Sequence, residues 1–128
     1  MTAPPSQRVI PTLRMSNEAR SRGFYVDGLG FRVDWTHRFE PHLPALLQVS
    51  RDGMTFYLSE HVMDCAVGGL IHLFVDSVDD WYAELRQNGV AIELPPTDQP
   101  WGLREMHLLD PDGNRLRICT RLPRRPEP

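Results

Sequence analysis

The feature that most restricts the fold of this chain is an internal repeat with an offset of about 60 residues. Gly30 and Gly89, 59 residues apart, each end a predicted helix and precede a predicted strand. Gly53 and Gly113, 60 residues apart, each lie in the last predicted hairpin turn of a copy. Because a repeat determines the architecture before any single element does, the chain is predicted to hold two copies of one unit. The alternative is one generic α+β domain whose turns coincide.

Each copy is predicted to contain a strand, a helix and three further strands, which makes two tandem βαβββ modules of an α+β fold. The predicted strands cover residues 9–15, 31–36, 45–50, 54–59, 68–75, 90–94, 103–109 and 114–120. Residues 95–100 are predicted to be a loop. The helices are predicted to begin at Ser16 or Asn17 and at Ser77, and Trp81 lies on the apolar stripe of the second.

A single domain is predicted over residues 8–121, with module one at about 8–60 and module two at about 68–121. The Pro-rich ends, 1–7 and 122–128, are predicted to be mobile tails. The net charge of -3 does not favour nucleic acid, and no apolar run approaches the ~20 residues that span a membrane. The two cysteines and the lack of a signal peptide indicate a cytoplasmic location. The acidic balance of the folded part weakly favours cationic ligands.

Short sequence motifs lie in both modules. The first module shows Ser, Glu and Phe-Tyr within residues 16–25, then Gly-Leu-Gly-Phe at 28–31. The closing hairpin shows Asp-Pro-Asp-Gly-Asn at 110–114. These motifs resemble the vicinal oxygen chelate superfamily, which includes glyoxalase I, extradiol dioxygenases and bleomycin-resistance proteins. Residues 99–105, Gln-Pro-Trp-Gly-Leu-Arg-Glu, look like the bleomycin-resistance branch. The resemblance covers residues 8–121 and implies a curved mixed sheet that forms a ligand cup.

Enzymes of that superfamily usually hold a divalent metal with His and Glu side chains from four strands. The resemblance places Ile10, Tyr57, Leu70 and Arg117 at those four positions. None of the first three is a normal metal ligand, and Arg117 would repel a cation. We therefore expect no metal and no other cofactor. His72 is the one residue that could overturn this expectation, because it lies two residues from Leu70 and shares its strand face.

Strand alternation predicts which side chains line the cup. If Leu70 faces the cup, His72 and Phe74 face it too, whereas Ile71 and Leu73 pack under a helix. In the bleomycin-resistance branch, the tryptophan that matches Trp101 stacks on the flat rings of the antibiotic. The alternative for Trp101 is that it closes the edge of the core. The predicted ligand-binding residues are Asp34, Trp35, Phe39, Tyr57, His72, Trp101 and Arg117.

The function expected first is binding without catalysis. The resemblance implies a homodimer, exchanging its N-terminal strand near Pro11, that sequesters a planar, cationic glycopeptide antibiotic at a dimer crevice and so confers antibiotic resistance. One alternative is an enzyme of the same fold, acting as a lyase, isomerase or dioxygenase on a small metabolite. Another is a binding module for a different planar natural product. No catalytic residues are predicted, because no spacing dictates contact among Tyr57, Glu60, His72 and Glu105.

Overall fold

The computed structural model describes residues 6–123. The tails predicted at 1–7 and 122–128 therefore lie largely outside the described residues. Within the described part, Gln7 Nε2 donates to the carbonyl oxygen of Thr55 at 2.6 Å. Leu122 N donates to the carbonyl oxygen of Gly102 at 3.0 Å. The two ends of the described chain are thus hydrogen-bonded to neighbouring segments of the domain.

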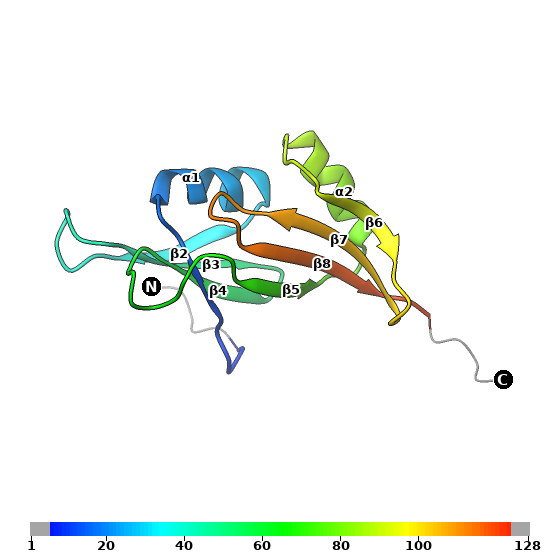
Figure 1. Cartoon of the computed structure of the whole chain (residues 1–128), viewed down its shortest axis with the longest axis horizontal. Coiled ribbons are helices and arrows are strands. Elements are labelled where there is room, and N and C mark those ends of the chain that lie inside the picture. The colour runs from blue at the N-terminus through cyan, green and yellow to red at the C-terminus, as the bar shows by residue number, and fades with distance from the viewer. Residues whose placement is uncertain (1–5, 124–128) are drawn as a thin grey trace.

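Each repeat forms one four-stranded mixed sheet, and the two sheets have the same strand order (Figure 1). The elements of the first module are β1 (Thr12–Arg14), α1 (Glu18–Arg22), the π-helical turn η1 (Gly23–Gly28), β2 (Arg32–His37), β3 (Leu46–Arg51) and β4 (Met54–Ser59). Those of the second are β5 (Leu70–Phe74), α2 (Val78–Gln87), β6 (Leu94–Asp98), β7 (Leu103–Leu109) and β8 (Arg115–Arg121). The strand orders are β1-β4-β3-β2 and β5-β8-β7-β6, with the first strand parallel to the last in each module. The predicted tandem repeat and α+β class are confirmed.

Both helices begin at side-chain caps that the sequence predicts. Asn17 Oδ1 accepts from Arg20 N at 2.9 Å, and Ser77 Oγ accepts from Asp80 N at 3.2 Å. Asn17, rather than Ser16, is the first cap. Ser16 instead bonds to Asp112 of the other module, with its backbone N 3.1 Å from Oδ2.

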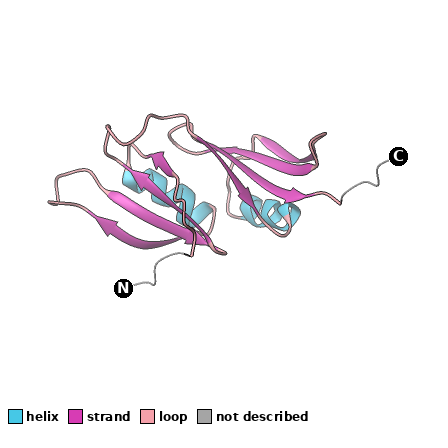
Figure 2. Cartoon of the chain, turned by 90° about the horizontal axis from the view of Figure 1, so that it is seen from below, coloured by secondary structure: helices cyan, strands magenta, loops and turns pink. Residues whose placement is uncertain are grey.

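The helices lie on the same side of the two sheets, as Figure 1 shows, and the sheets lie beside one another along the molecule (Figure 2). The core fills the space between helices and sheets. Its aromatic centre joins the modules, because Phe31 of the first packs edge-on against Trp81 of the second at 6.4 Å between ring centroids. Trp81 is 6% exposed, which confirms its predicted place in the core. Within residues 6–123, no helix has the length and apolar character that crossing a membrane requires.

The prediction for residues 90–100 was wrong. The strand expected at 90–94 begins only at its last residue, and β6 occupies most of the expected loop despite Pro95 and Pro96. A proline cannot donate to a ladder, so it is tolerated only at sheet edges and bulges. Both conditions hold here, because β6 is the edge strand and its register with β7 shifts between Leu94 and Thr97. The first strand was also predicted too long, since β1 covers only Thr12–Arg14.

Candidate functional site

The face of the second sheet turned away from the helices is open. On β5, Phe74 is 44% exposed while Leu73 is 5% exposed. Leu70 and His72 are also exposed, so the predicted alternation along this strand is confirmed. Leu109 of β7, on the same face, is exposed as well. This surface is called the second face below. Its exposed apolar side chains are Leu70, Phe74 and Leu109, and polar side chains lie between them.

A row of three basic or titratable side chains crosses the middle of the second face. His72 is the cross-strand partner of Arg117, and Arg117 is the partner of His107. Partners in register point to the same side of a sheet, so the three side chains form one line over β5, β8 and β7. Leu70 pairs with Arg115 instead. Leu70 and Arg117, two of the positions compared with metal ligands, are therefore not cross-strand partners. Arg117 lies two residues along β8 from the partner of Leu70.

Arg117 is partly buried on this face, and within residues 6–123 its guanidinium makes no side-chain hydrogen bond or ion pair with the protein. Its positive charge nevertheless acts on two neighbouring titratable groups. It contributes to lowering the pKa of Glu105 and opposes the rise in the pKa of Cys119. A guanidinium carries five N–H donors. Arg117 therefore offers donors to any group that lies on the second face.

Glu105 is buried beneath this row, with an exposed fraction of 0%. Its Oε2 accepts from Trp101 Nε1 at 2.7 Å, and its Oε1 accepts from His107 Nε2 at 2.9 Å. Burial alone raises the pKa of this carboxyl, but the hydrogen bonds from His107 and Trp101 outweigh it and hold the pKa below its ordinary value. Glu105 is thus an ionised anchor that orients two side chains of the site.

Trp101 lies in the turn between β6 and β7 and is 62% exposed, so it does not close the edge of the core. The turn borders a hollow of about 1020 Å³, whose lining includes Trp101, Leu103 and Arg121. Arg121 also lies over the ring of Phe74, 4.5 Å from its centroid. The hollow and the second face therefore share a wall. Its volume suits a drug-sized molecule.

The corresponding face of the first sheet brings Asp34, Trp35 and Tyr57 together. A bulge between Val33 and Trp35 breaks the alternation of β2, so Asp34 and Trp35 lie on the same face. The rings of Trp35 and Tyr57 meet edge-on, 5.4 Å apart. Three of the predicted ligand-binding residues thus form one cluster, which lies on a different sheet from His72, Trp101 and Arg117.

The Asp34 carboxylate is already occupied by its neighbours. Gln48 Nε2 donates to it at 2.9 Å, Ser50 Oγ donates to the same oxygen, and Arg32 Nε donates at 2.8 Å. Burial raises its pKa, but these three donors outweigh burial and leave the pKa below its ordinary value. Asp34 therefore bonds to polar side chains on this face of the first sheet, and its carboxylate has little capacity left to bind a ligand.

Phe39 is the predicted site residue that stands apart. It is 75% exposed in the segment between β2 and β3, and its aromatic contact is with His37 at 4.6 Å. The residues at the four compared positions, Ile10, Tyr57, Leu70 and Arg117, do not fit a divalent metal, because their side chains offer no carboxylate or imidazole. Within residues 6–123, no three His, Cys, Asp or Glu side chains are grouped as a metal site.

Glu60, one of the four residues considered for catalysis, is occupied by backbone groups, and the thiol of Cys119 is buried. Glu60 accepts backbone N–H groups, from Ala45 at 2.8 Å and from Glu18 at 3.2 Å. Cys119 is fully buried on β8, and burial together with the charge of Glu105 raises its pKa to about 11. A thiol with so high a pKa is a poor nucleophile near neutral pH.

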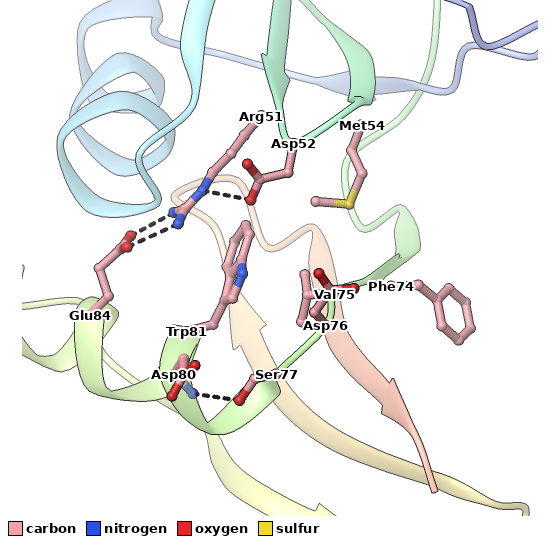
Figure 3. A pocket seen from close by; sticks show the side chains of 10 residues that line it. All are labelled: Arg51, Asp52, Met54, Phe74, Val75, Asp76, Ser77, Asp80, Trp81 and Glu84. Carbon is pink, nitrogen blue, oxygen red and sulfur yellow. Dashed lines mark hydrogen bonds and ion pairs between the residues drawn. The ribbon is translucent and has the colours of Figure 1, made fainter. Parts of the chain in front are cut away.

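A second cavity, which the sequence did not indicate, lies at the junction of the modules (Figure 3). It occupies about 440 Å³ between the β3–β4 hairpin and the start of α2. Arg51 crosses it, donating to Glu84 Oε1 at 2.9 Å and lying 3.9 Å from the centroid of the Trp81 ring. Arg51 also donates to the carbonyl oxygen of Leu29 at 2.6 Å. Because Arg51 links the Leu29 carbonyl of the first module to Glu84 and Trp81 of the second, we interpret this cavity as part of the contact between the modules.

Known proteins share the family and the fold of this chain. A family model described as "Glyoxalase superfamily protein" matches residues 5–124. YraH of Bacillus subtilis (strain 168), described as uncharacterized, is 27% identical over 121 residues, covering 86% of this chain and 94% of YraH. The crystal structure of TnmS3, an antibiotic binding protein from Streptomyces sp. CB03234, is 25% identical with a TM-score of 0.71, covering 91% of this chain and 98% of TnmS3. A bleomycin-binding protein complexed with bleomycin is 21% identical with a TM-score of 0.73, covering 90% and 98%.

Proposed function

Because this chain belongs to the glyoxalase superfamily, we propose that it is a metal-free binding protein that sequesters a planar, antibiotic-like small molecule. TnmS3, described as an antibiotic binding protein, supports this choice among the roles that the fold can serve. A fold alone does not determine function, so the proposal depends on the residues of the second face.

The observation that carries the proposal is the exposed indole of Trp101 anchored to the buried carboxylate of Glu105. An exposed aromatic ring is free to stack on a ligand, and its fixed N–H lowers the entropy that binding would cost. The hollow beside Trp101 and the exposed ring of Phe74, which lies against Arg121, supply the remaining contact surface.

The crevice is completed, in this proposal, by a second copy of the chain. The second face exposes 44% of Leu70 and 46% of Leu109. Apolar side chains grouped on an open face are typical of surfaces that a partner or ligand covers. In a homodimer, the Trp35–Tyr57 cluster of one copy would face the Trp101 region of the other. Exchange of the N-terminal strand near Pro11 remains part of the proposal.

The first ligand to test is a planar, cationic glycopeptide antibiotic of the bleomycin type, and the role expected with it is antibiotic resistance. Intrinsic tryptophan fluorescence is a suitable readout, because Trp101 is far more exposed than Trp81. We expect both copper-free and copper-loaded bleomycin to quench emission at micromolar concentration. We also expect Trp101→Leu to lose most of the quenching, whereas Trp81→Phe, at the buried tryptophan, keeps it.

If bleomycin does not quench the emission but another planar natural product does, the protein is still a binding protein, and its ligand is not of the bleomycin type. The enzymatic alternative is tested separately by metal analysis of the purified protein. One tightly held divalent ion per chain would contradict a metal-free role, and His72 would then be the first ligand to examine.

A further inference from the structure

Charge is distributed unevenly between the two sides of the second sheet. The whole chain has a net charge of -3. The second face nevertheless carries three arginines, Arg115, Arg117 and Arg121, which alternate along β8, against one carboxylate, Glu105. Residues two apart on a strand share a face, so the three guanidinium groups form one basic line.

Several acidic residues of the second module lie on the helix side instead. Asp79, Asp80 and Glu84 all belong to α2. Arg104, which alternates to the side opposite Glu105, is paired there with Asp79 at 3.0 Å and also with Asp98 at 2.9 Å. The chain therefore separates an acidic helix side from a basic open face. The net charge of the sequence says nothing of this separation.

Within the basic line, Arg117 is the best placed to hold a ligand. It is partly buried, it is flanked in register by His72 and His107, and in the described part of the chain it has no carboxylate partner. Glu105, the nearest carboxylate of the face, accepts from Trp101 and His107 instead. A partly desolvated guanidinium with free donors favours a planar oxyanion, which it can bind through two parallel hydrogen bonds.

We infer that the row His72–Arg117–His107 is an anion-binding subsite, which takes a carboxylate or similar oxyanion attached to an aromatic ring system. This inference rests on the proposed function and specifies the charge of the ligand at that site. The oxyanion lies on Arg117, with the two imidazoles beside it. The ring system extends toward Phe74 and Trp101, along the face that these residues share with Arg121. A ligand that also carries a cationic tail must direct that tail away from β8.

Three small probes with the same ring and different charges test the subsite: 2-naphthoate, 2-naphthamide and 2-naphthylmethylammonium. Their dissociation constants are measured by two-dimensional ¹H–¹⁵N NMR titration of the full chain, following the indole N–H of Trp101 and the Nε–H groups of the arginines. We expect naphthoate to bind about tenfold more tightly than naphthamide, as a hydrogen bond to a charged group implies. The ammonium probe is expected to bind most weakly.

The variant Arg117→Gln removes the guanidinium and keeps a polar side chain of moderate size. We expect it to abolish the preference for naphthoate over naphthamide and to change the affinity for naphthamide far less than that for naphthoate. Arg20→Gln, on the exposed side of α1, makes the same charge change away from the face and should preserve the preference. Retention of naphthamide binding also shows that Arg117→Gln is folded.

The outcomes separate this inference from the proposed function. If all three probes shift Trp101 with equal affinity, or if the ammonium probe binds best, the anion subsite is overturned while the aromatic-binding site stands. If no probe shifts Trp101 or Arg117 at millimolar concentration, both fail. If naphthoate binds through Arg115 or Arg121 and Arg117→Gln does not alter it, the position assigned to the subsite is wrong.

Discussion

The most exposed of the three tryptophans is hydrogen-bonded to a carboxylate with no exposure at all: Trp101 Nε1 lies 2.7 Å from Glu105 Oε2. The two residues are four apart in sequence, with Trp101 in the turn between β6 and β7 and Glu105 on β7. Glu105 is thus ionised inside the sheet and holds an aromatic ring at its surface. Retaining a buried charge is costly unless it is well bonded. The same bond therefore stabilises the sheet and positions the ring.

The substitution Glu105→Gln should release the indole of Trp101. A neutral amide has one acceptor oxygen, so it cannot accept charge-assisted bonds from Trp101 and His107 together. We expect the indole N–H of Trp101 to exchange with solvent hydrogen much faster in the variant than in the wild type, as measured by NMR. The indole N–H of Trp81 is the internal control and should not change. Equal exchange of Trp101 in both proteins would contradict the anchoring role.

Stability should depend on pH through Glu105 in a direction that its pKa sets. The pKa of this carboxyl is held below its ordinary value of 4.5, so its ionised form stabilises the folded state above pH 4.5. That contribution is lost as the pH falls through the folded pKa. Urea unfolding at pH 7 should show Glu105→Gln less stable than the wild type by about 2 kcal/mol. The difference should shrink steadily below pH 4.5, and a constant difference down to pH 2.5 would refute the assignment.

The joint between the modules should depend on Arg51. Its guanidinium contacts Glu84, the ring of Trp81 and the carbonyl oxygen of Leu29, as Figure 3 shows in part. We expect Arg51→Ala to lower the free energy of unfolding by about 2–3 kcal/mol, because it removes hydrogen bonds to a charged group and a cation–π contact.

Arg86→Ala on the same helix side is the matched control for that measurement. Arg86 is exposed and bonds only locally, to Tyr82 at 3.0 Å. Its loss should cost less than about 0.5 kcal/mol, the usual range for surface positions. Similar costs for the two variants would show that Arg51 does not join the modules.

The proposed homodimer predicts a solution mass near twice the 14.7 kDa of the chain. Size-exclusion chromatography with light scattering measures it directly. We expect Leu109→Asp, on the open second face, to shift the mass toward that of one chain, because a buried unpaired charge disfavours association. Asp79→Asn, on α2, alters charge on the helix side and should leave the mass unchanged. A mass of 14.7 kDa for the wild type would contradict the dimer.

Much of the fold could be predicted from patterns that each module repeats. The glycine spacing predicted the repeat, the polar residues at 16–17 and 77 predicted where the helices begin, and alternation placed Leu70, His72 and Phe74 on one face. These signals are local, so they survive without knowledge of the partner strands. β6 was not predicted because prolines are tolerated in a strand only at a sheet edge or a bulge. Whether a strand lies at an edge depends on the assembled sheet, which the local sequence does not show.

The site was predicted less completely, because its geometry depends on contacts across turns and strands. Nothing in sequence spacing shows that Asp34 and Trp35 share a face, since that follows from a bulge. The role of Glu105 depends on a hydrogen bond across the β6–β7 turn. The acidic balance of the folded part favoured a cationic ligand, whereas β8 gathers three arginines on the open face. The charge of a ligand is therefore predicted from the charged residues on the binding face and not from the charge of the whole chain.

The central claim is that the second face binds a planar ligand between Trp101 and Arg117, and a crystal structure of the complex with 2-naphthoate tests it most directly. We predict the ring system against Trp101 or Phe74 and the carboxylate within hydrogen-bond distance of the Arg117 guanidinium, flanked by His72 and His107. Naphthoate bound instead in the cavity beside Arg51 and Trp81, with the second face unoccupied, would contradict the account.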